Sequence, residues 1–223
     1  LRLGHSSMQQ LHKLPQHATG VPKHISKGIH PLRHCTTCSQ AQHRKTKKGK
    51  SADHKTTTAG QQFHIDFGFM RATDLDYAKT SNKKKQKRIV KSIDGYSSYL
   101  LITDAHTRIV WVFLTKSKHP PINAVRRVLK EFGAGDDVKG KSVRVDQGGE
   151  LARSSEFCKM VADCGFTVEP TGADCAWMNG KVERLNQTFG IMVRALLYSS
   201  GLNPEFWSWA LIHAVYIKNR LWH

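Results

Sequence analysis

Three carboxylates occupy positions from which they could bind metal ions. Asp66 lies within the run Gln61 to Met70, where aromatic and aliphatic residues alternate with polar ones. Asp146 follows the short apolar run Val143 to Val145, and Glu183 lies near the start of a helical pattern. Carboxylate oxygens are preferred ligands of Mg²⁺, and two such ions roughly 3.5 to 4 Å apart can activate a nucleophile and stabilise the leaving oxygen in phosphodiester cleavage. These residues are therefore candidates for a site that binds two Mg²⁺ or Mn²⁺ ions.

Each carboxylate taken alone has a simpler structural explanation. An Asp at the end of a strand commonly forms a turn, and a Glu in a first helical turn offsets the helix dipole. Asp94 and Asp104 compete with Asp66, although Asp94 precedes a Gly-Tyr-Ser turn and Asp104 lies in an expected hairpin turn. Glu150, four residues after Asp146, is expected to be structural. The case for chemistry therefore rests on the three carboxylates taken together.

A second group of residues has the spacing of a zinc site. Cys35 and Cys38 form a Cys-x2-Cys pair, whose thiolates could chelate one Zn²⁺. His5 is a candidate ligand with 29 residues between it and Cys35, and His12, with 22 residues between, is a weaker one. The other three of the five cysteines stand alone, a pattern that favours a reducing compartment. We therefore expect zinc at this pair rather than a disulfide.

Positive charge is concentrated at the start of the chain. Residues 1–91 carry 19 Lys and Arg against 4 Asp and Glu, whereas residues 92–223 carry 16 against 13, within a net charge of +18. Clustered cations gain affinity for a polyphosphate because they release its condensed counterions. Nucleic acid is therefore the expected partner, with an anionic membrane surface as a weaker alternative.

The periodicity of the sequence predicts which elements carry these residues. A chain of 223 residues can form one α/β core with a small appended module. Strands are predicted at 61–70, 99–103, 109–114, 143–145 and 166–168, and helices at 120–132, 154–164, 179–199 and 205–221. An exposed insertion is predicted at 71–88. This order favours a mixed sheet flanked by helices rather than a doubly wound nucleotide-binding fold.

The sequence has no apolar run of the roughly 18 residues that a membrane span requires, and no signal-peptide pattern at its start. We therefore expect a soluble intracellular protein with no membrane partner.

The three carboxylates lie in motifs that resemble those of a known enzyme family. HIDFG, VDQGGE and NGKVERLNQT, with 36 residues between Asp146 and Glu183, resemble the catalytic motifs of the DDE integrases of copia-type LTR retrotransposons. SSYLLITDAHTRIVWVFLTKSK resembles the central hairpin of that family, and GLNPEFWSWALIHAVYIKNRL resembles its closing helices. The resemblance covers nearly the whole chain. Two departures are Gln147, where Asn is usual, and residues 172–178, which replace a loop rich in Pro and Gln.

The resemblance implies a fold and a domain organisation. It implies an RNase H-like mixed five-stranded sheet flanked by helices, preceded by a small truncated zinc-knuckle module. Residues 1–42 would be a pre-integrase module of the His-His-Cys-Cys type, 43–60 a basic linker and 61–223 the catalytic core. His5 would be the second histidine ligand, so that its partner would lie upstream of residue 1.

The resemblance also implies an activity. Asp66, Asp146 and Glu183 would bind Mg²⁺ and catalyse end processing and strand transfer of retrotransposon DNA into target DNA. Contacts to DNA are expected from Arg44, Lys45, Lys47, Lys48, Lys181, Arg184, Asn186 and Gln187. The family implies a homo-oligomer, cut from a polyprotein, that acts in a cytoplasmic particle and in the nucleus.

Two alternatives stay open. A transposase or nuclease of the same fold would use the same chemistry. A domesticated or decayed relative would only bind nucleic acid; the three carboxylates argue against it, whereas Gln147 and the altered loop favour it.

Overall fold

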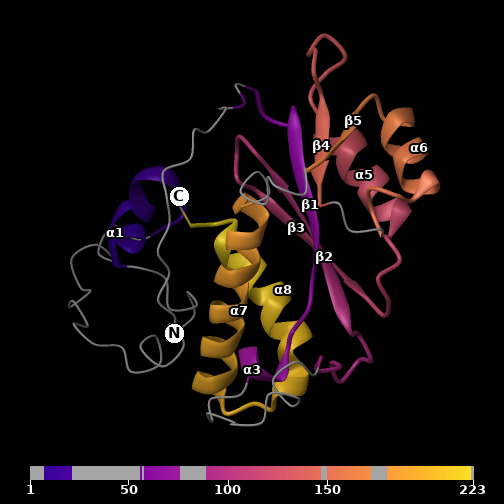
Figure 1. The fold of residues 1–223 in the computed structure, drawn as a ribbon. Helices are drawn as coiled ribbons and strands as arrows, with labels where there is room; N and C mark the ends of the chain where they lie inside the picture. Colours follow the sequence, from indigo (N-terminus) through magenta and orange to yellow (C-terminus); the bar gives the residue numbers. More distant parts are fainter. Residues whose placement is uncertain are drawn as a thin grey trace. The chain divides into compact units, whose positions relative to one another are not determined.

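A mixed five-stranded sheet forms the centre of the fold in the computed structural model (Figure 1). The structure describes residues 8–21, 56, 58–75, 89–146, 150–171 and 180–221. The strands are β1 (Gln62–Gly68), β2 (Ser98–Asp104), β3 (Val110–Thr115), β4 (Ser142–Val145) and β5 (Thr167–Pro170). Their order in the sheet is β3-β2-β1-β4-β5, which is the mixed arrangement that the sequence predicted.

Strand directions bring four strand ends to the same edge of the sheet. β2 runs antiparallel to both β1 and β3, whereas β4 runs parallel to β1 and β5 runs parallel to β4. The carboxyl ends of β1, β3, β4 and β5 therefore share one edge, which we call the carboxyl edge. The end of β2, with Asp104, lies at the opposite edge.

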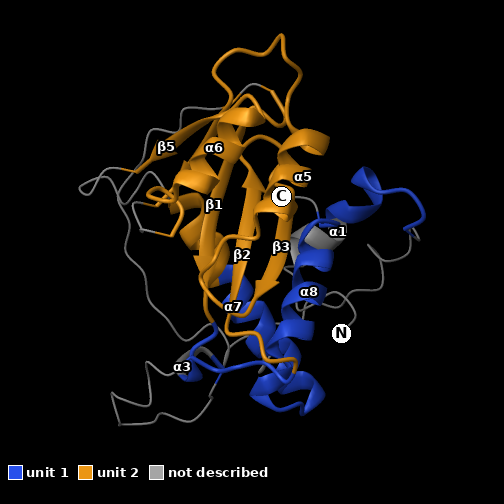
Figure 2. Ribbon diagram, turned by 90° about the vertical axis from the view of Figure 1, so that its right-hand side faces the viewer, with its two compact units in different colours: residues 1–46, 70–93, 188–223 blue, residues 47–69, 94–187 orange. Residues whose placement is uncertain are grey.

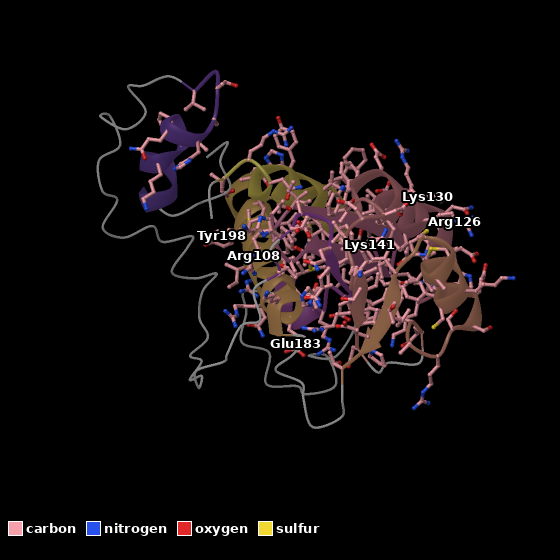
Figure 3. All side chains as sticks on the ribbon, turned by 90° about the horizontal axis from the view of Figure 1, so that it is seen from above. Arg108, Arg126, Lys130, Lys141, Glu183 and Tyr198 are labelled. Carbon is pink, nitrogen blue, oxygen red and sulfur yellow. The ribbon has the colours of Figure 1, made fainter. Side chains whose placement is uncertain are left out.

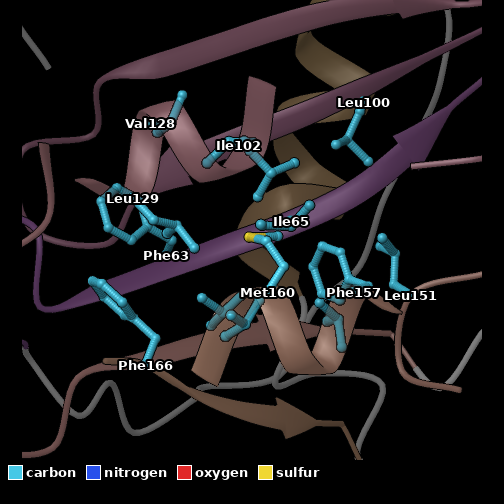
Figure 4. Packing of buried hydrophobic residues seen from close by; sticks show 14 residues of the cluster. Phe63, Ile65, Leu100, Ile102, Val128, Leu129, Leu151, Phe157, Met160 and Phe166 are labelled. Carbon is cyan, nitrogen blue, oxygen red and sulfur yellow. The ribbon is translucent and has the colours of Figure 1, made fainter. Parts of the chain in front are cut away.

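One face of the sheet is apolar and forms the main core. Ile65 pairs with Ile102 on β2, and Phe63 pairs with Val143 on β4. Phe63 and Ile65 are two residues apart, so their side chains point to the same face. They pack with two helices, α5 (Ile122–Phe132) and α6 (Ser155–Asp163), as Figure 4 shows. Burying each such side chain contributes roughly 1.5 to 3 kcal/mol. The neighbouring residues of the same strands, Asp66 included, face the other side because strand side chains alternate.

The two core helices begin where the sequence predicted. α5 follows Pro120 and Pro121, and it buries Val125, Val128 and Leu129, which recur at helical spacing. α6 is capped by Ser154, whose hydroxyl oxygen accepts a hydrogen bond from the Phe157 backbone N–H at 3.3 Å. These helices therefore hold β1, β4 and β5 from one side.

The described residues divide into two compact units (Figure 2). The sheet unit consists of residues 47–69 and 94–187, and the second unit consists of residues 1–46, 70–93 and 188–223. α7 (Gly180–Ser200) begins in the sheet unit and continues into the second one. The second unit also holds α1 (Met8–His17), α3 (Ala72–Leu75), η3 (Pro204–Phe206) and α8 (Trp207–Lys218).

Contacts within the second unit join segments that are distant in sequence. The Trp207 indole Nε1 donates a hydrogen bond to the Val90 carbonyl at 2.9 Å. Leu14 of α1 packs against Ile217 and Leu221. Among the described residues, no helix combines the length and the apolar character needed to cross a membrane.

Two local features differ from the sequence-based expectations. α1 lies in the part predicted as a zinc module, for which the sequence analysis gave no secondary structure. The segment predicted as an exposed insertion begins with a β-bridge between Arg71 and Ile89. The short helix α3 follows, and its apolar residue Leu75 is only 2% exposed, so this part of the segment is partly buried. The rest of that insertion, 76–88, lies outside the described residues.

Candidate active site

Asp66 and Asp146 lie beside each other on neighbouring parallel strands. Ile65 on β1 pairs with Val145 on β4, so the two aspartates that follow are next in the same register. Paired strands are about 4.8 Å apart, and residues in register point to the same face. Asp66 is half-buried within β1, whereas Asp146 is exposed directly after β4. The two carboxylates therefore share the polar face near the carboxyl edge.

The third carboxylate comes from the first turn of α7. Glu183 lies there with its side chain exposed (Figure 3). Asn186 is three residues later, hence on the same face of the helix. Its amide Nδ2 donates a hydrogen bond to Asp66 Oδ2 at 3.0 Å. This bond fixes the face of α7 that carries Glu183 toward the sheet residue Asp66.

The pKa of Asp66 is raised by its burial and by the two neighbouring carboxylates. Its pKa rises from an ordinary 3.8 to about 7, mainly because burial disfavours the charged form and then because the charge of Asp146 lies close by. The charge of Glu183 adds to the rise, while hydrogen bonds from the Phe67 backbone and from Asn186 oppose it. Without metal, Asp66 is therefore about half protonated near neutral pH.

The donor chemistry of the site fits a divalent cation. Carboxylate oxygens are hard ligands of the kind that Mg²⁺ takes, and the positive charge would relieve the repulsion that raises the pKa of Asp66. Within the described part of the chain, Asn186 Oδ1 is buried and has no hydrogen-bond partner. In the same described residues, no three His, Cys, Asp or Glu side chains are close enough to hold a metal together. The carboxylates thus influence one another without forming a closed ligand shell.

Sequence analysis missed a neighbour of Asp146. Thr171, just after β5, is 3% exposed, and its backbone N–H donates to the Val145 carbonyl at 3.0 Å. Its hydroxyl lies 3.3 Å from that carbonyl and 3.5 Å from Asp146 Oδ1. A single Thr has no motif that would reveal this role, because it depends on the pairing of β4 with β5.

Asp104 and Glu150 have partners of their own in the structure. Asp104 is 2% exposed, and its Oδ1 accepts a hydrogen bond from the Gly60 backbone N–H at 3.1 Å. Its Oδ2 accepts bonds from the Thr107 backbone and hydroxyl at 2.8 and 2.6 Å. Glu150 is ion-paired with Lys118 at 2.7 Å. The structure therefore supports the expectation that Asp104 belongs to the hairpin turn.

Comparison with known proteins found a relative in sequence. Over 135 residues, or 59% of the chain, the sequence is 30% identical to the "Retrovirus-related Pol polyprotein from transposon TNT 1-94" of Nicotiana tabacum. This chain is a homologue of a copia-type Pol polyprotein. It spans 10% of the length of that polyprotein. No protein-family model matches the sequence.

The fold of this Pol homologue is similar to a chain in a viral assembly. That chain belongs to the cryo-EM structure of a simian T-cell lymphotropic virus intasome in complex with PP2A regulatory subunit B56 gamma. The TM-score is 0.54 at 13% identity, over 93% of this chain and 60% of the other. The match concerns the fold alone, and the observed sheet agrees with the expected mixed five-stranded sheet flanked by helices.

The predicted DNA contacts and zinc ligands stay predictions. Arg184 and Gln187 are exposed on α7 and Lys181 is half-buried. Asn186 was also expected to contact DNA, and its amide donates a hydrogen bond to Asp66. Seven other predicted residues lie outside the described part of the chain: His5, Cys35, Cys38, Arg44, Lys45, Lys47 and Lys48.

Proposed function

We propose that this Pol homologue is the catalytic core of a DDE-type integrase, which cuts and joins DNA with Mg²⁺ or Mn²⁺. One observation carries the proposal: Asp66 and Asp146 lie in register on parallel strands, and the Asn186 bond brings the first turn of α7, with Glu183, to the same place. The order and spacing of the three motifs support the same conclusion.

The three carboxylates would together bind two ions near the carboxyl edge. When bound, the ions would activate a nucleophile and stabilise the leaving oxygen. Asp66 must lose its proton to act as a ligand, and a nearby cation favours that loss. Asn186 would keep Asp66 Oδ2 in place, and Thr171 would limit the movement of Asp146 at the end of β4.

The proposed substrates are the ends of retrotransposon DNA and a target duplex. Water would be the nucleophile in end processing, and a DNA 3′-hydroxyl in strand transfer. We also propose that Cys35, Cys38 and His5 bind Zn²⁺ and that the enzyme acts as a homo-oligomer in the nucleus.

A second candidate is a relative that binds nucleic acid without catalysis. The observation that favours it is that no metal-binding group of three side chains forms among the described residues. Gln147, where the family usually has Asn, points the same way. The two candidates differ in whether divalent cations produce cleavage or joining of DNA.

The decisive experiment is a strand-transfer assay on short duplexes with Mg²⁺ or Mn²⁺. Changing Glu183→Gln should reduce activity by about a thousandfold or more, which corresponds to roughly 4 kcal/mol of transition-state stabilisation. The matched control is Glu156→Gln, because Glu156 is also an exposed Glu in a first helical turn, that of α6. Both changes remove a charge that offsets a helix dipole, but only the first removes a proposed ligand. Near-normal activity of Glu183→Gln would contradict the proposed mechanism, in which all three carboxylates bind the metal ions.

A further inference from the structure

Lys118 joins three structural elements at the carboxyl edge. It follows β3, and its ammonium Nζ lies 2.7 Å from Glu150 Oε1. The same nitrogen lies 5.3 Å from the centre of the Phe69 ring, a cation–π contact. Phe69 comes three residues after Asp66, and Glu150 comes four residues after Asp146. Lys118 is therefore held between the segments that follow two of the proposed catalytic residues.

The loop that carries Lys118 is anchored by the neighbouring strand. Ser98, on β2, is fully buried, and its hydroxyl lies 2.8 Å from the Thr115 hydroxyl and 3.1 Å from the Ser117 carbonyl. The Ser97 hydroxyl donates to the Lys116 carbonyl at 2.9 Å. These bonds fix the backbone directly before Lys118, so the sheet restricts the position of Lys118.

A purely structural explanation of the ion pair is weak. The side chains of Lys118 and Glu150 are 53% and 35% exposed, and exposed ion pairs contribute about 0 to 1 kcal/mol. Stability alone therefore gives little reason for such an arrangement. The hydrogen bond to Glu150 uses one of the three N–H donors of the ammonium group. The half-exposed cation can thus bind a further anion without leaving Glu150.

We propose that Lys118 binds a phosphate of the nucleic-acid substrate at the carboxyl edge, and that Glu150 is the positioning residue that holds its ammonium group there. This proposal rests on the proposed function, because it takes the substrate to be DNA lying over the carboxylates. A Lys binds phosphate as a point charge, and the anchored loop and the Phe69 ring restrict where that charge lies.

The test compares the salt dependence of duplex binding, measured by fluorescence anisotropy with the full 223-residue chain in EDTA. Each neutralised phosphate contributes about −0.9 to the slope of log affinity against log salt concentration, so Lys118→Gln should flatten the slope by about one. Lys118→Arg should keep the parent slope. Glu150→Gln breaks the same ion pair but leaves the cation, so it should not flatten the slope. The matched control is Arg127→Gln, because Arg127 forms an exposed ion pair with Glu131 on α5.

The outcomes separate the two proposals. If Lys118→Gln and Glu150→Gln change binding equally, or if Lys118→Gln matches Arg127→Gln, Lys118 is a structural residue and this inference is wrong. Strand transfer by the parent chain is measured separately with Mg²⁺. A parent that binds DNA with the expected Lys118 effect but never cuts or joins it contradicts the proposed integrase activity alone. A parent that binds no duplex contradicts both.

Discussion

The two edges of the sheet hold aspartates with opposite environments. At one edge, Asp104 is almost fully buried, and its two oxygens accept three hydrogen bonds from Gly60 and Thr107. At the carboxyl edge, Asp66 accepts one side-chain hydrogen bond, from Asn186, and lies close to the charge of Asp146. The hydrogen bonds around Asp104 favour a charged carboxylate. Burial and the neighbouring charges raise the free energy of a charged carboxylate at Asp66.

This contrast shows how a structural carboxylate differs from a candidate ligand. Buried carboxylates that are satisfied by donors need no further partner, and they stabilise the turn that supplies those donors. A carboxylate crowded by like charges is costly unless a cation or a proton neutralises it. Both aspartates are near the end of a strand and next to apolar residues, so the difference depends on their neighbours in space.

The largest effect on stability should come from the pH dependence of Asp66. Its pKa is about 7 in the folded chain and 3.8 as an ordinary value, so the folded state binds more protons between these limits. Without metal, the free energy of unfolding should therefore fall as the pH rises from about 4 to about 7. The destabilisation present above pH 7 should be about 4 kcal/mol, because each unit of the pKa difference corresponds to roughly 1.4 kcal/mol.

Urea unfolding in EDTA at pH 5 and pH 8 measures this effect. Asp66→Asn should remove most of the fall, so that the variant is more stable than the parent at pH 8. Adding Mg²⁺ at pH 8 should stabilise the parent more than the variant. Identical pH profiles for the two proteins would show that Asp66 is not in a strained charge environment.

A somewhat smaller effect is expected at the opposite edge. Asp104→Asn replaces an acceptor oxygen with an amide donor that faces the donors of Gly60 or Thr107. The free energy of unfolding should fall by about 2 kcal/mol, since hydrogen bonds to charged groups contribute roughly 1.5 to 3 kcal/mol. The sequence alone predicted only that Asp104 lies in a hairpin turn.

Asp163→Asn is the control for that prediction, because Asp163 is exposed near the end of α6. Its unfolding free energy should change by less than about 0.5 kcal/mol. If Asp104→Asn is equally mild, the buried hydrogen bonds contribute less than their geometry indicates.

Regular elements could be predicted from the sequence because their patterns are local. The alternation around Asp66 and the helical spacing of Val125, Val128 and Leu129 each identify an element and its buried face. Ser154, at the start of the helix predicted at 154–164, caps α6. These elements were found within a few residues of their observed bounds.

Contacts that depend on pairing between distant segments could not be predicted. Thr171 is near Asp146 only because β5 lies beside β4, and Asn186 reaches Asp66 across 120 positions of sequence. The motifs identified the three carboxylates as a group, but they gave no way to tell a residue that contacts DNA from one that holds a carboxylate. The hydrogen bond from Asn186 to Asp66 favours the second role for Asn186.

Substitutions of Asn186 and Gln187 should distinguish a residue that positions Asp66 from one that contacts DNA. Their expected effects are the smallest of those predicted here. Asn186→Ala leaves Asp66 Oδ2 without its side-chain donor, so strand-transfer activity should fall about tenfold, or roughly 1.4 kcal/mol. The loss should be accompanied by a higher Mg²⁺ concentration for half-maximal activity and by unchanged duplex affinity in EDTA. Gln187 is the next residue and is exposed, so Gln187→Ala should weaken duplex binding without changing the Mg²⁺ requirement if Gln187 contacts DNA.

The free energy of unfolding should change little in either variant. Asn186→Ala also removes the buried Oδ1 that has no hydrogen-bond partner among the described residues. If Asn186→Ala weakens duplex binding and leaves the Mg²⁺ requirement as it was, Asn186 contacts DNA and the bond to Asp66 does not position the carboxylate.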